Sequence, residues 1–357
     1  MPTLWGQKYS RSEVLARVGD LSQLGGARSY RIDGGPGDGV PVVEVDTGSG
    51  FRFTVVPGRA LDISGAWYRG IPLGHRTITG EMHGAYYEPH DRDWIRSTVL
   101  GLLVTCGLDN IGNAGEDESG YHGLHGRLSN LAASNVLADG EWNGDEYDIW
   151  VQGKVRQGAL YTEKFVLQRR ISTRLGATSL QIQDTVTNLG HTPEPMMIMY
   201  HMNPGWPVID QGARLHVRSR SRRPMDQYAA AADKDWANYS GPAKDWVAQV
   251  WTHDVDAGPD GTVYAALVNP SFKGGFGLEF TWNKRQLPFL NHWRQLGQGD
   301  YVTGIEPGNA SVFGRVQNRA DGTLPILEPG ESRTFDLAIG VLDGAKAVEA
   351  AVQRAGG

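Results

Sequence analysis

Short segments of alternating apolar and polar residues, separated by glycine-containing turns, run through almost the whole chain. Residues 41–46 (PVVEVD) and 51–56 (FRFTVV) show the pattern, and the turn TGSG joins them as in a β-hairpin. Similar segments predict strands at 148–155, 164–171, 179–186, 196–202, 213–219, 246–252, 262–268, 276–282, 301–306, 311–316 and 333–341. Because no helices alternate with these strands, the pattern argues against a parallel βαβ sheet. We expect an all-β fold of two large antiparallel sheets packed face to face.

Helical spacing is found mainly near the two ends of the sequence. Residues 12–24 predict a helix with Ser12 as its N-cap, and residues 345–355 predict a second helix. We expect a single domain over residues 1–357, with a helical or extended lead-in at 1–35 and a terminal helix at 345–357. A charged, alanine-rich segment at 225–245 predicts a long loop, which suggests a task such as covering a site.

The composition limits the kinds of molecule that the protein is expected to bind. The chain has 34 basic and 40 acidic residues, so it lacks the basic excess of a nucleic-acid-binding protein. No apolar run is long enough for a signal peptide or a membrane span, so we expect no membrane partner. The single cysteine, Cys106, excludes an internal disulfide and fits a reducing cytoplasm. We therefore expect a cytoplasmic monomer or homodimer. The 11 tryptophans indicate either a large core or surfaces that stack on sugar rings.

Three segments carry residues suited to acid/base chemistry. YHGLHGRLSN (121–130) contains His122 and His125 among glycines. The strand in PMMIMYHMNPG (195–205) delivers His201 at its end, and YVTGIEPGN (301–309) delivers Glu306 at the end of another. A carboxylate beside an imidazole at a sheet rim is a candidate acid/base pair. The alternative is structural: a tight glycine turn, a histidine satisfied by its neighbours and a carboxylate that stabilises a turn.

These segments resemble the galactose mutarotase (aldose 1-epimerase) superfamily, and the match is to an outlying bacterial branch. VTNLGHTPEPMMIMYHMNPG resembles the family segment that carries the general acid, which implies that role for His201. LHG resembles the motif of the second active-site histidine and implies His125, whereas GIEPGN implies that Glu306 is the catalytic base. GRALD (58–62) implies that Arg59 contacts substrate. The resemblance implies a galactose mutarotase-like supersandwich, an isomerase of carbohydrate metabolism and a monosaccharide substrate.

Some features depart from the family pattern. MNPGWP follows His201 in place of the usual aromatic-rich tract, and His122 is an additional histidine. The aspartate that holds substrate in the family has no clear counterpart, and Asp226 is the first candidate, with Asp210 the second. Trp293, shortly before the base, and Trp206, shortly after the acid, are candidate platforms for a sugar ring.

Anomeric interconversion needs one group that removes the C1 hydroxyl proton and another that protonates the ring oxygen. Glu306 and His201 suffice for this, so no cofactor is expected, and we expect an ionised Glu306 and a protonated His201 at rest.

Two other functions are compatible with the same residues. In the first, His122, His125, His201 and Glu306 ligate a divalent metal such as Zn or Mn in a metal-dependent sugar isomerase or epimerase. In the second, the protein binds carbohydrate without catalysis.

Overall fold

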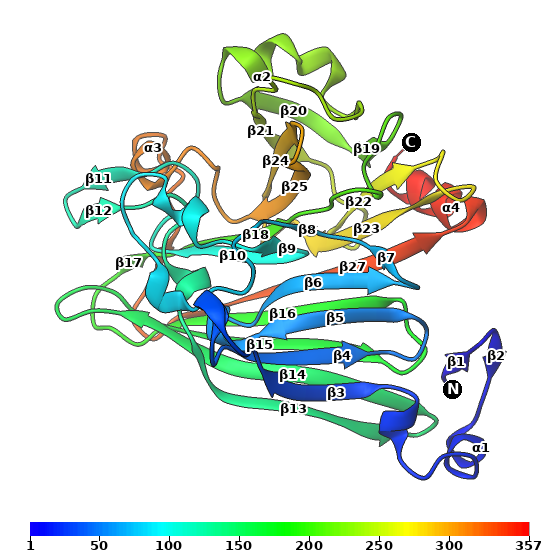
Figure 1. Ribbon diagram of the computed structural model, residues 1–357. Helices are drawn as coiled ribbons and strands as arrows, with labels where there is room; N and C mark the ends of the chain where they lie inside the picture. The colour runs from blue at the N-terminus through cyan, green and yellow to red at the C-terminus, as the bar shows by residue number, and fades with distance from the viewer. Residues whose placement is uncertain (357) are drawn as a thin grey trace.

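Two antiparallel sheets lie face to face in the computed structural model, which describes residues 1–356 (Figure 1). In Figure 1 the blue strands β3–β6 of one sheet lie beside the green strands β13–β16 of the other. The larger sheet has eleven strands, with β7 (Ile71–Pro72) attached to β6, in the order β20 (Ser219–Pro224), β21 (Gln249–Val255), β24 (Phe289–Leu296), β25 (Tyr301–Gly308), β18 (Met197–Met202), β10 (Leu103–Leu108), β6 (Asp62–Tyr68), β5 (Phe51–Val56), β4 (Pro41–Asp46), β3 (Gly26–Arg31).

The smaller sheet has eight strands. Its order is β13 (Ala133–Asn143), β14 (Glu146–Gly158), β15 (Lys164–Arg174), β16 (Ser179–Asn188), β27 (Ser332–Asp343), β23 (Phe276–Asn283), β22 (Thr262–Asn269), β19 (Arg214–Val217). Four two-stranded ribbons accompany the sheets: β1–β2 (Thr3–Leu4, Gln7–Lys8), β8–β9 (His75–Arg76, Leu100–Gly101), β11–β12 (Gly115–Asp117, Gly120–His122), β17–β26 (Glu194–Pro195, Ile326–Leu327). The predicted all-β sandwich is confirmed.

Helices are few and short. They are α1 (Arg11–Leu15), α2 (Gln227–Ala231), α3 (Arg315–Ala320) and α4 (Ala345–Arg354). Helix α4 confirms the start of the predicted terminal helix but ends at Arg354, with Ala355 as its C-cap, and residue 357 lies outside the described residues. Within residues 1–356, no helix combines the length and apolar character needed to cross a membrane.

The helix predicted at 12–24 is wrong in its start and its length. Ser10, not Ser12, is the N-cap of α1, and a capping box with Glu13 fixes this start. After Leu15 the chain turns, and only a short 3₁₀ segment, η1 (Leu21–Gln23), follows.

The strand predicted at 311–316 is also wrong. Ser311 accepts a hydrogen bond at its carbonyl from Asn318 Nδ2, 2.8 Å away, while its own N–H donates to Asn318 Oδ1 at 3.1 Å. Gly314, with φ +94°, then starts α3 at Arg315. These side-chain bonds replace the ladder bonds that a strand would make.

The main core fills the space between the sheets. Ile63, Leu103 and Ile305 of the larger sheet belong to one buried cluster with Leu167 and Phe280 of the smaller sheet. The two inner faces thus bury each other, as in other sandwiches.

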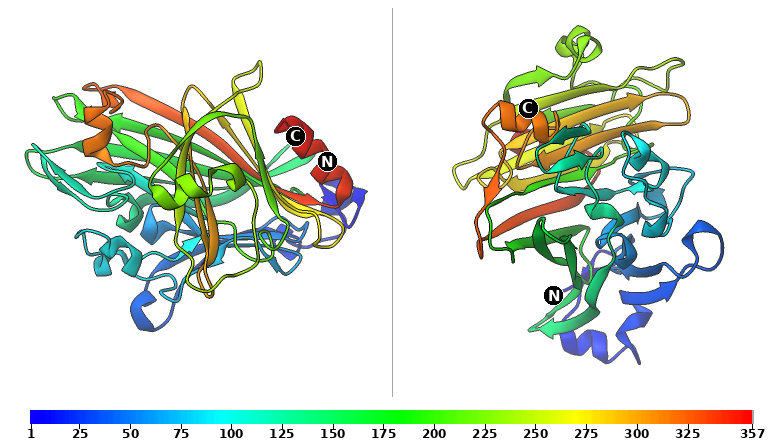
Figure 2. Two further views of the ribbon diagram at one scale, coloured as in Figure 1. Left: turned by 90° about the horizontal axis from the view of Figure 1, so that it is seen from above. Right: turned by 90° about the vertical axis from the view of Figure 1, so that its left-hand side faces the viewer.

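The larger sheet is buried on its outer face as well. Along β18, Ile198, Tyr200 and Met202 face the main core, whereas Met197 and Met199 belong to a second cluster. That cluster includes Val104, Cys106 and Val302, and segment 71–131 covers it with residues such as Trp94 and Leu100. In both views of Figure 2 this cyan segment lies against the outer side of the blue and orange strands. Burial on two faces explains why β18 is apolar without alternation.

The segment at 225–245 does not form a free loop. It contains α2 and the 3₁₀ turn η7 (Asp233–Asp235). Its Ala237 carbonyl accepts from Leu215 N–H at 2.8 Å, and Tyr239 N–H donates to the Ala213 carbonyl at 3.0 Å. Trp236 and Tyr239 pack into the main core. The segment thus closes one end of the sandwich next to β19.

Candidate functional site

His201 and Glu306 lie opposite each other on neighbouring strands. The pairs Met199–Gly308 and Met202–Ile305 set the register of β18 and β25, and this register places His201 across from Glu306. The His201 Nε2 and Glu306 Oε1 atoms are 3.1 Å apart. His201 is 4% exposed and Glu306 is 1% exposed, so the two groups meet in a largely dry environment.

The sequence after Glu306 fixes this register. Asn309 Oδ1 accepts a hydrogen bond from Ile198 N–H at 2.8 Å, and Asn309 Nδ2 donates to the Met196 carbonyl at 2.9 Å. A side-chain amide thereby replaces ladder bonds beyond Pro307, which has no N–H. The GIEPGN motif therefore holds β25 against β18.

Burial shifts the pKa values of His201 and Glu306, which are called the dyad below. It lowers the pKa of His201 to about 4, opposed by hydrogen bonding with Asn203. Burial also raises the pKa of Glu306 well above its ordinary value. Near neutral pH both shifts favour a protonated Glu306 and a neutral His201, because an isolated charge is costly in a dry site. Both shifts run against the expected resting state, with an ionised Glu306 and a protonated His201.

His125 lies beside the dyad. Its ring meets the His201 ring edge to face, with centroids 5.4 Å apart. The centroids of the His125 and Trp94 rings are 4.8 Å apart. The backbone N–H of Gly112 donates to His125 Nδ1 at 3.2 Å. Burial, then the neighbouring His201, holds the pKa of His125 well below its ordinary value. The ring is therefore neutral with its proton on Nε2, so it can donate one hydrogen bond.

Of the two predicted tryptophan platforms, one contacts the dyad. Trp293 lies in β24, and its ring is edge to face with His201 at 5.6 Å. Trp206 is 59% exposed, and its indole Nε1 donates to Asp210 Oδ2 at 3.1 Å. Asp210, the second candidate for a substrate-holding aspartate, thus accepts a hydrogen bond from that indole.

The Arg59 guanidinium donates most of its hydrogen bonds to backbone carbonyls. It ends the 3₁₀ turn η3 (Pro57–Arg59) and is buried. Its Nε donates to the Ser129 carbonyl at 2.5 Å, and its Nη1 donates to the carbonyls of Met82 and Ser97 at 2.9 and 2.8 Å. Arg59 therefore holds three points of the covering segment, and only Nη2 remains for the substrate contact that the sequence predicts.

His122 belongs to a separate polar group. Its Nε2 lies 3.1 Å from Asp117 Oδ1, and its Nδ1 lies 3.5 Å from Asp109 Oδ2. Arg315 also pairs with Asp117, at 2.8 Å. This group joins ribbon β11–β12 to α3, which lie side by side in Figure 1, so the observed contacts give His122 a structural role.

Asp226 is a helix cap. Its Oδ1 accepts hydrogen bonds from the N–H groups of Tyr228 and Ala229, both at 2.9 Å, and it thereby begins α2. The helix packs on β20 and β21 at the edge of the larger sheet. The Asp226 carboxylate therefore caps a helix, and its contact with substrate stays a prediction.

The four residues of the metal alternative do not form one ligand set. In residues 1–356, no group of three or more His, Cys, Asp or Glu side chains has an arrangement that could hold a metal ion. His122 turns both ring nitrogens to aspartates, which separates it from the His201–Glu306 pair.

The structure adds neighbours that the sequence did not single out. Trp94, from the 3₁₀ turn η5 (Asp93–Arg96), packs against His125 with its ring tilted by 59°. Asn203 is fully buried, and its Nδ2 donates to the His201 carbonyl at 2.8 Å. The H-x-N spacing places Asn203 and His201 on the same face of an extended chain, a signal that was available in the sequence.

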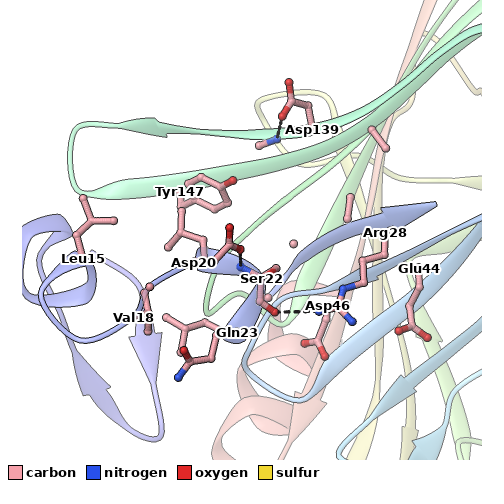
Figure 3. Close-up of a pocket in the computed structure, with 18 residues that line it drawn as sticks. Leu15, Val18, Asp20, Ser22, Gln23, Arg28, Glu44, Asp46, Asp139 and Tyr147 are labelled. Carbon is pink, nitrogen blue, oxygen red and sulfur yellow. Dashed lines mark hydrogen bonds between the residues drawn. The ribbon is translucent and has the colours of Figure 1, made fainter.

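A separate groove lies away from these residues. It measures about 540 Å³ and runs between the lead-in and the hairpin of β13 and β14 (Figure 3). Leu15 and Val18 line one side and Tyr147 the other, while Asp20 Oδ1 accepts from Ser22 N–H at 2.7 Å. None of the predicted site residues lines this groove.

Comparisons with known proteins agree with the fold. The family model described as domain of unknown function DUF4432 matches residues 37–341. A candidate aldose 1-epimerase from Klebsiella pneumoniae has a similar structure, with a TM-score of 0.88 and 26% identity over 94% of this chain and 89% of that chain. A galactose mutarotase-like protein from Clostridium acetobutylicum has a TM-score of 0.59 and 13% identity, covering 89% of this chain and 98% of its own. The galactose 1-epimerase of Lactobacillus acidophilus has a TM-score of 0.59 and 9% identity, covering 89% and 99%. No curated protein matches the chain.

Proposed function

The chain belongs to the DUF4432 family and has a galactose mutarotase-like fold, and from that premise we propose that it is an aldose 1-epimerase-like isomerase. It interconverts the anomers of a free monosaccharide by acid/base ring opening, without a cofactor. The observation that carries the proposal is the buried His201–Glu306 pair, with Nε2 and Oε1 3.1 Å apart. The galactose 1-epimerase from Lactobacillus acidophilus is similar in fold, at 9% identity.

The dyad holds one proton between a carboxylate and an imidazole, so it can give a proton and take one at the same time. In the working form the proton is on His201 Nε2. Glu306 removes the proton of the C1 hydroxyl, His201 protonates the ring oxygen, and the C1–O5 bond breaks to give the open-chain aldehyde. Rotation about C1–C2 and the reverse steps close the ring as the other anomer and restore the dyad. Each positioned group contributes about 10²–10⁴-fold.

The surrounding residues support a neutral sugar substrate. His125, fixed as the Nε2–H tautomer by Gly112, donates to a sugar hydroxyl, and Arg59 Nη2 supplies a second donor. Trp293, edge to face with His201, offers an apolar ring for the C–H face of a pyranose.

The test is anomer exchange measured by polarimetry and by NMR exchange spectroscopy on a panel of freshly dissolved aldoses. Activity above the spontaneous rate, unaffected by chelator, supports the proposal. Loss of activity with chelator and recovery with Zn or Mn would instead favour the metal-dependent isomerase. Saturable sugar binding without any exchange would favour a carbohydrate-binding protein.

A further inference from the structure

A glycine lies directly beneath the Glu306 carboxylate. Gly304 is two residues before Glu306 in β25, so both face the same side of the sheet. On one side the register pairs Gly304 with Trp293 of β24, and on the other side it lies across from Asn203. Gly304 is buried. A glycine inside a central strand weakens the strand and commonly marks a close approach by another group.

The close approach here is made by the dyad itself. A Cβ at Gly304 would fall well inside the van der Waals radius of Glu306 Oε1, and it would lie 3.0 Å from His201 Cε1. The nearest atoms to that Cβ are therefore the reacting carboxylate and the imidazole opposite it, not backbone atoms. The backbone of Gly304 has no positive φ, so a side chain at this position would be opposed by these contacts and not by the backbone conformation.

The geometry points to Gly304 as a positioning residue, whose missing side chain forms the seat that holds the Glu306 carboxylate beside His201. This inference rests on the proposed function for its kinetic consequence, but the seat itself is a structural claim. A methyl group at 304 would push the carboxylate out of line with Nε2. A displacement of about 1 Å in a catalytic group can cost about 10²-fold in rate.

The central experiment compares Gly304→Ala with two other strand glycines. At Gly340 in β27 an added Cβ meets only Ser179 Cβ, at 3.7 Å, so Gly340→Ala is the control with room. At Gly277 in β23 the added Cβ would press on the Leu267 carbonyl, so Gly277→Ala is the control for a purely structural clash. We expect Gly304→Ala to lower kcat about 10²-fold with KM changed less than about threefold. We expect Gly277→Ala to lower thermal stability instead, and Gly340→Ala to change neither.

Two further variants tie the effect to Glu306. Gly304→Ala combined with Glu306→Gln should be no slower than Glu306→Gln alone, because both changes remove the same group from its place. If Gly304→Ala destabilises the protein, adding Glu306→Asp should restore stability, since the shorter side chain withdraws the carboxylate from the new methyl. Multiplicative losses of kcat, or no recovery of stability with Glu306→Asp, would overturn the assignment.

A readout without substrate separates this inference from the proposed function. The His201 ring signals, followed by NMR with labelled histidine and no sugar, should shift in Gly304→Ala toward those in Glu306→Gln. They should stay unchanged in Gly340→Ala. If the wild-type protein anomerises no sugar but these signals shift as stated, the seat stands and the proposed function fails. Unchanged His201 signals in Gly304→Ala would refute the seat whatever the activity.

Discussion

His125 and His201 form one pair of buried histidines and His253 and His292 another, and the two pairs differ in what their rings contact. His125 and His201 lie on the outer face of the larger sheet, beside Trp94 and Trp293. His253 in β21 and His292 in β24 lie at the end of the sandwich that segment 225–245 closes. Both groups combine imidazoles with indole rings, so residue types alone do not separate them.

Burial and pKa do not separate the two groups either. Burial lowers the pKa of His253 to about 3 and holds that of His292 well below its ordinary value, as it does for His125 and His201. Their partners differ. His253 Nδ1 is 2.9 Å from Ser219 Oγ, and His292 Nε2 is 3.1 Å from Tyr239 Oη, whereas His201 faces a carboxylate. A hydroxyl partner stabilises a neutral ring, but only a carboxylate of raised pKa can exchange a proton with it.

The largest expected effect follows from removing that carboxylate. Glu306→Gln keeps the size of the side chain and should reduce kcat by about 10²-fold or more, because the group that exchanges the C1 hydroxyl proton is lost. Glu279→Gln is the matched control, since Glu279 is a surface carboxylate of β23 paired with Arg354 at 2.8 Å. Anomer exchange by NMR measures both variants. A Glu306→Gln enzyme with wild-type kcat would remove the distinction between the two histidine groups.

The second effect compares one histidine from each group. His201→Asn should lower kcat by about 10²-fold while sugar binding, measured by calorimetry, changes little. His253→Asn should leave kcat within about twofold and lower the free energy of unfolding by about 1–3 kcal/mol, because it disturbs a packed aromatic cluster. If His253→Asn abolished turnover in a folded protein, the catalytic role would have to include the end of the sandwich.

The same contrast shows how far the sequence could predict the site. His201 and Glu306 can be predicted from the sequence because each lies where an apolar strand is followed by proline and glycine. Strand β24 was missed because His292 and Arg294 occupy its inward positions, where polar residues break the expected alternation. Without β24 the register that pairs Trp293 with Gly304 is invisible, so the glycine seat could not be predicted.

The sequence does not predict the role of a residue whose contacts lie far away in the chain. Nothing near Arg59 in the chain indicates that it donates to the carbonyls of Met82, Ser97 and Ser129. The pKa shifts of His201 and Glu306, which run against an ionised Glu306 and a protonated His201, could not be predicted either, because the depth of burial follows from covering segment 71–131 and not from the two motifs.

A smaller effect is expected in the pH dependence of stability. Between about pH 4.5 and 6.5, unfolded His201 carries a proton that folded His201 lacks, whereas folded Glu306 keeps a proton that the unfolded chain has lost. The two contributions oppose each other in wild type. Glu306→Gln leaves only the histidine term, so the free energy of unfolding should rise with pH more steeply, by up to about 1.4 kcal/mol per pH unit.

Denaturant titrations from pH 4.5 to 6.5 measure this slope. Burial, then Arg222, lowers the pKa of His253 despite the opposing charge of Asp233, so His253→Asn should change the slope in the other direction and make it shallower. Identical slopes in wild type and Glu306→Gln would mean that Glu306 is ionised in the folded protein.

The smallest effect concerns Asp226, the first candidate for the substrate-holding aspartate, which the structure shows as the N-cap of α2. Helix α2 belongs to the segment that closes the sandwich over His253 and His292, so the cap serves the structural group. Asp226→Ala should lower the free energy of unfolding by about 1 kcal/mol and leave KM and kcat unchanged. Ser10→Ala, at the cap of α1, is the matched control and should cost a similar amount. Chemical denaturation and anomer-exchange kinetics on both variants decide between the roles. A KM that rises tenfold in Asp226→Ala but not in Ser10→Ala would show that the carboxylate reaches the sugar. In that case the closing segment would belong to the same site as the dyad.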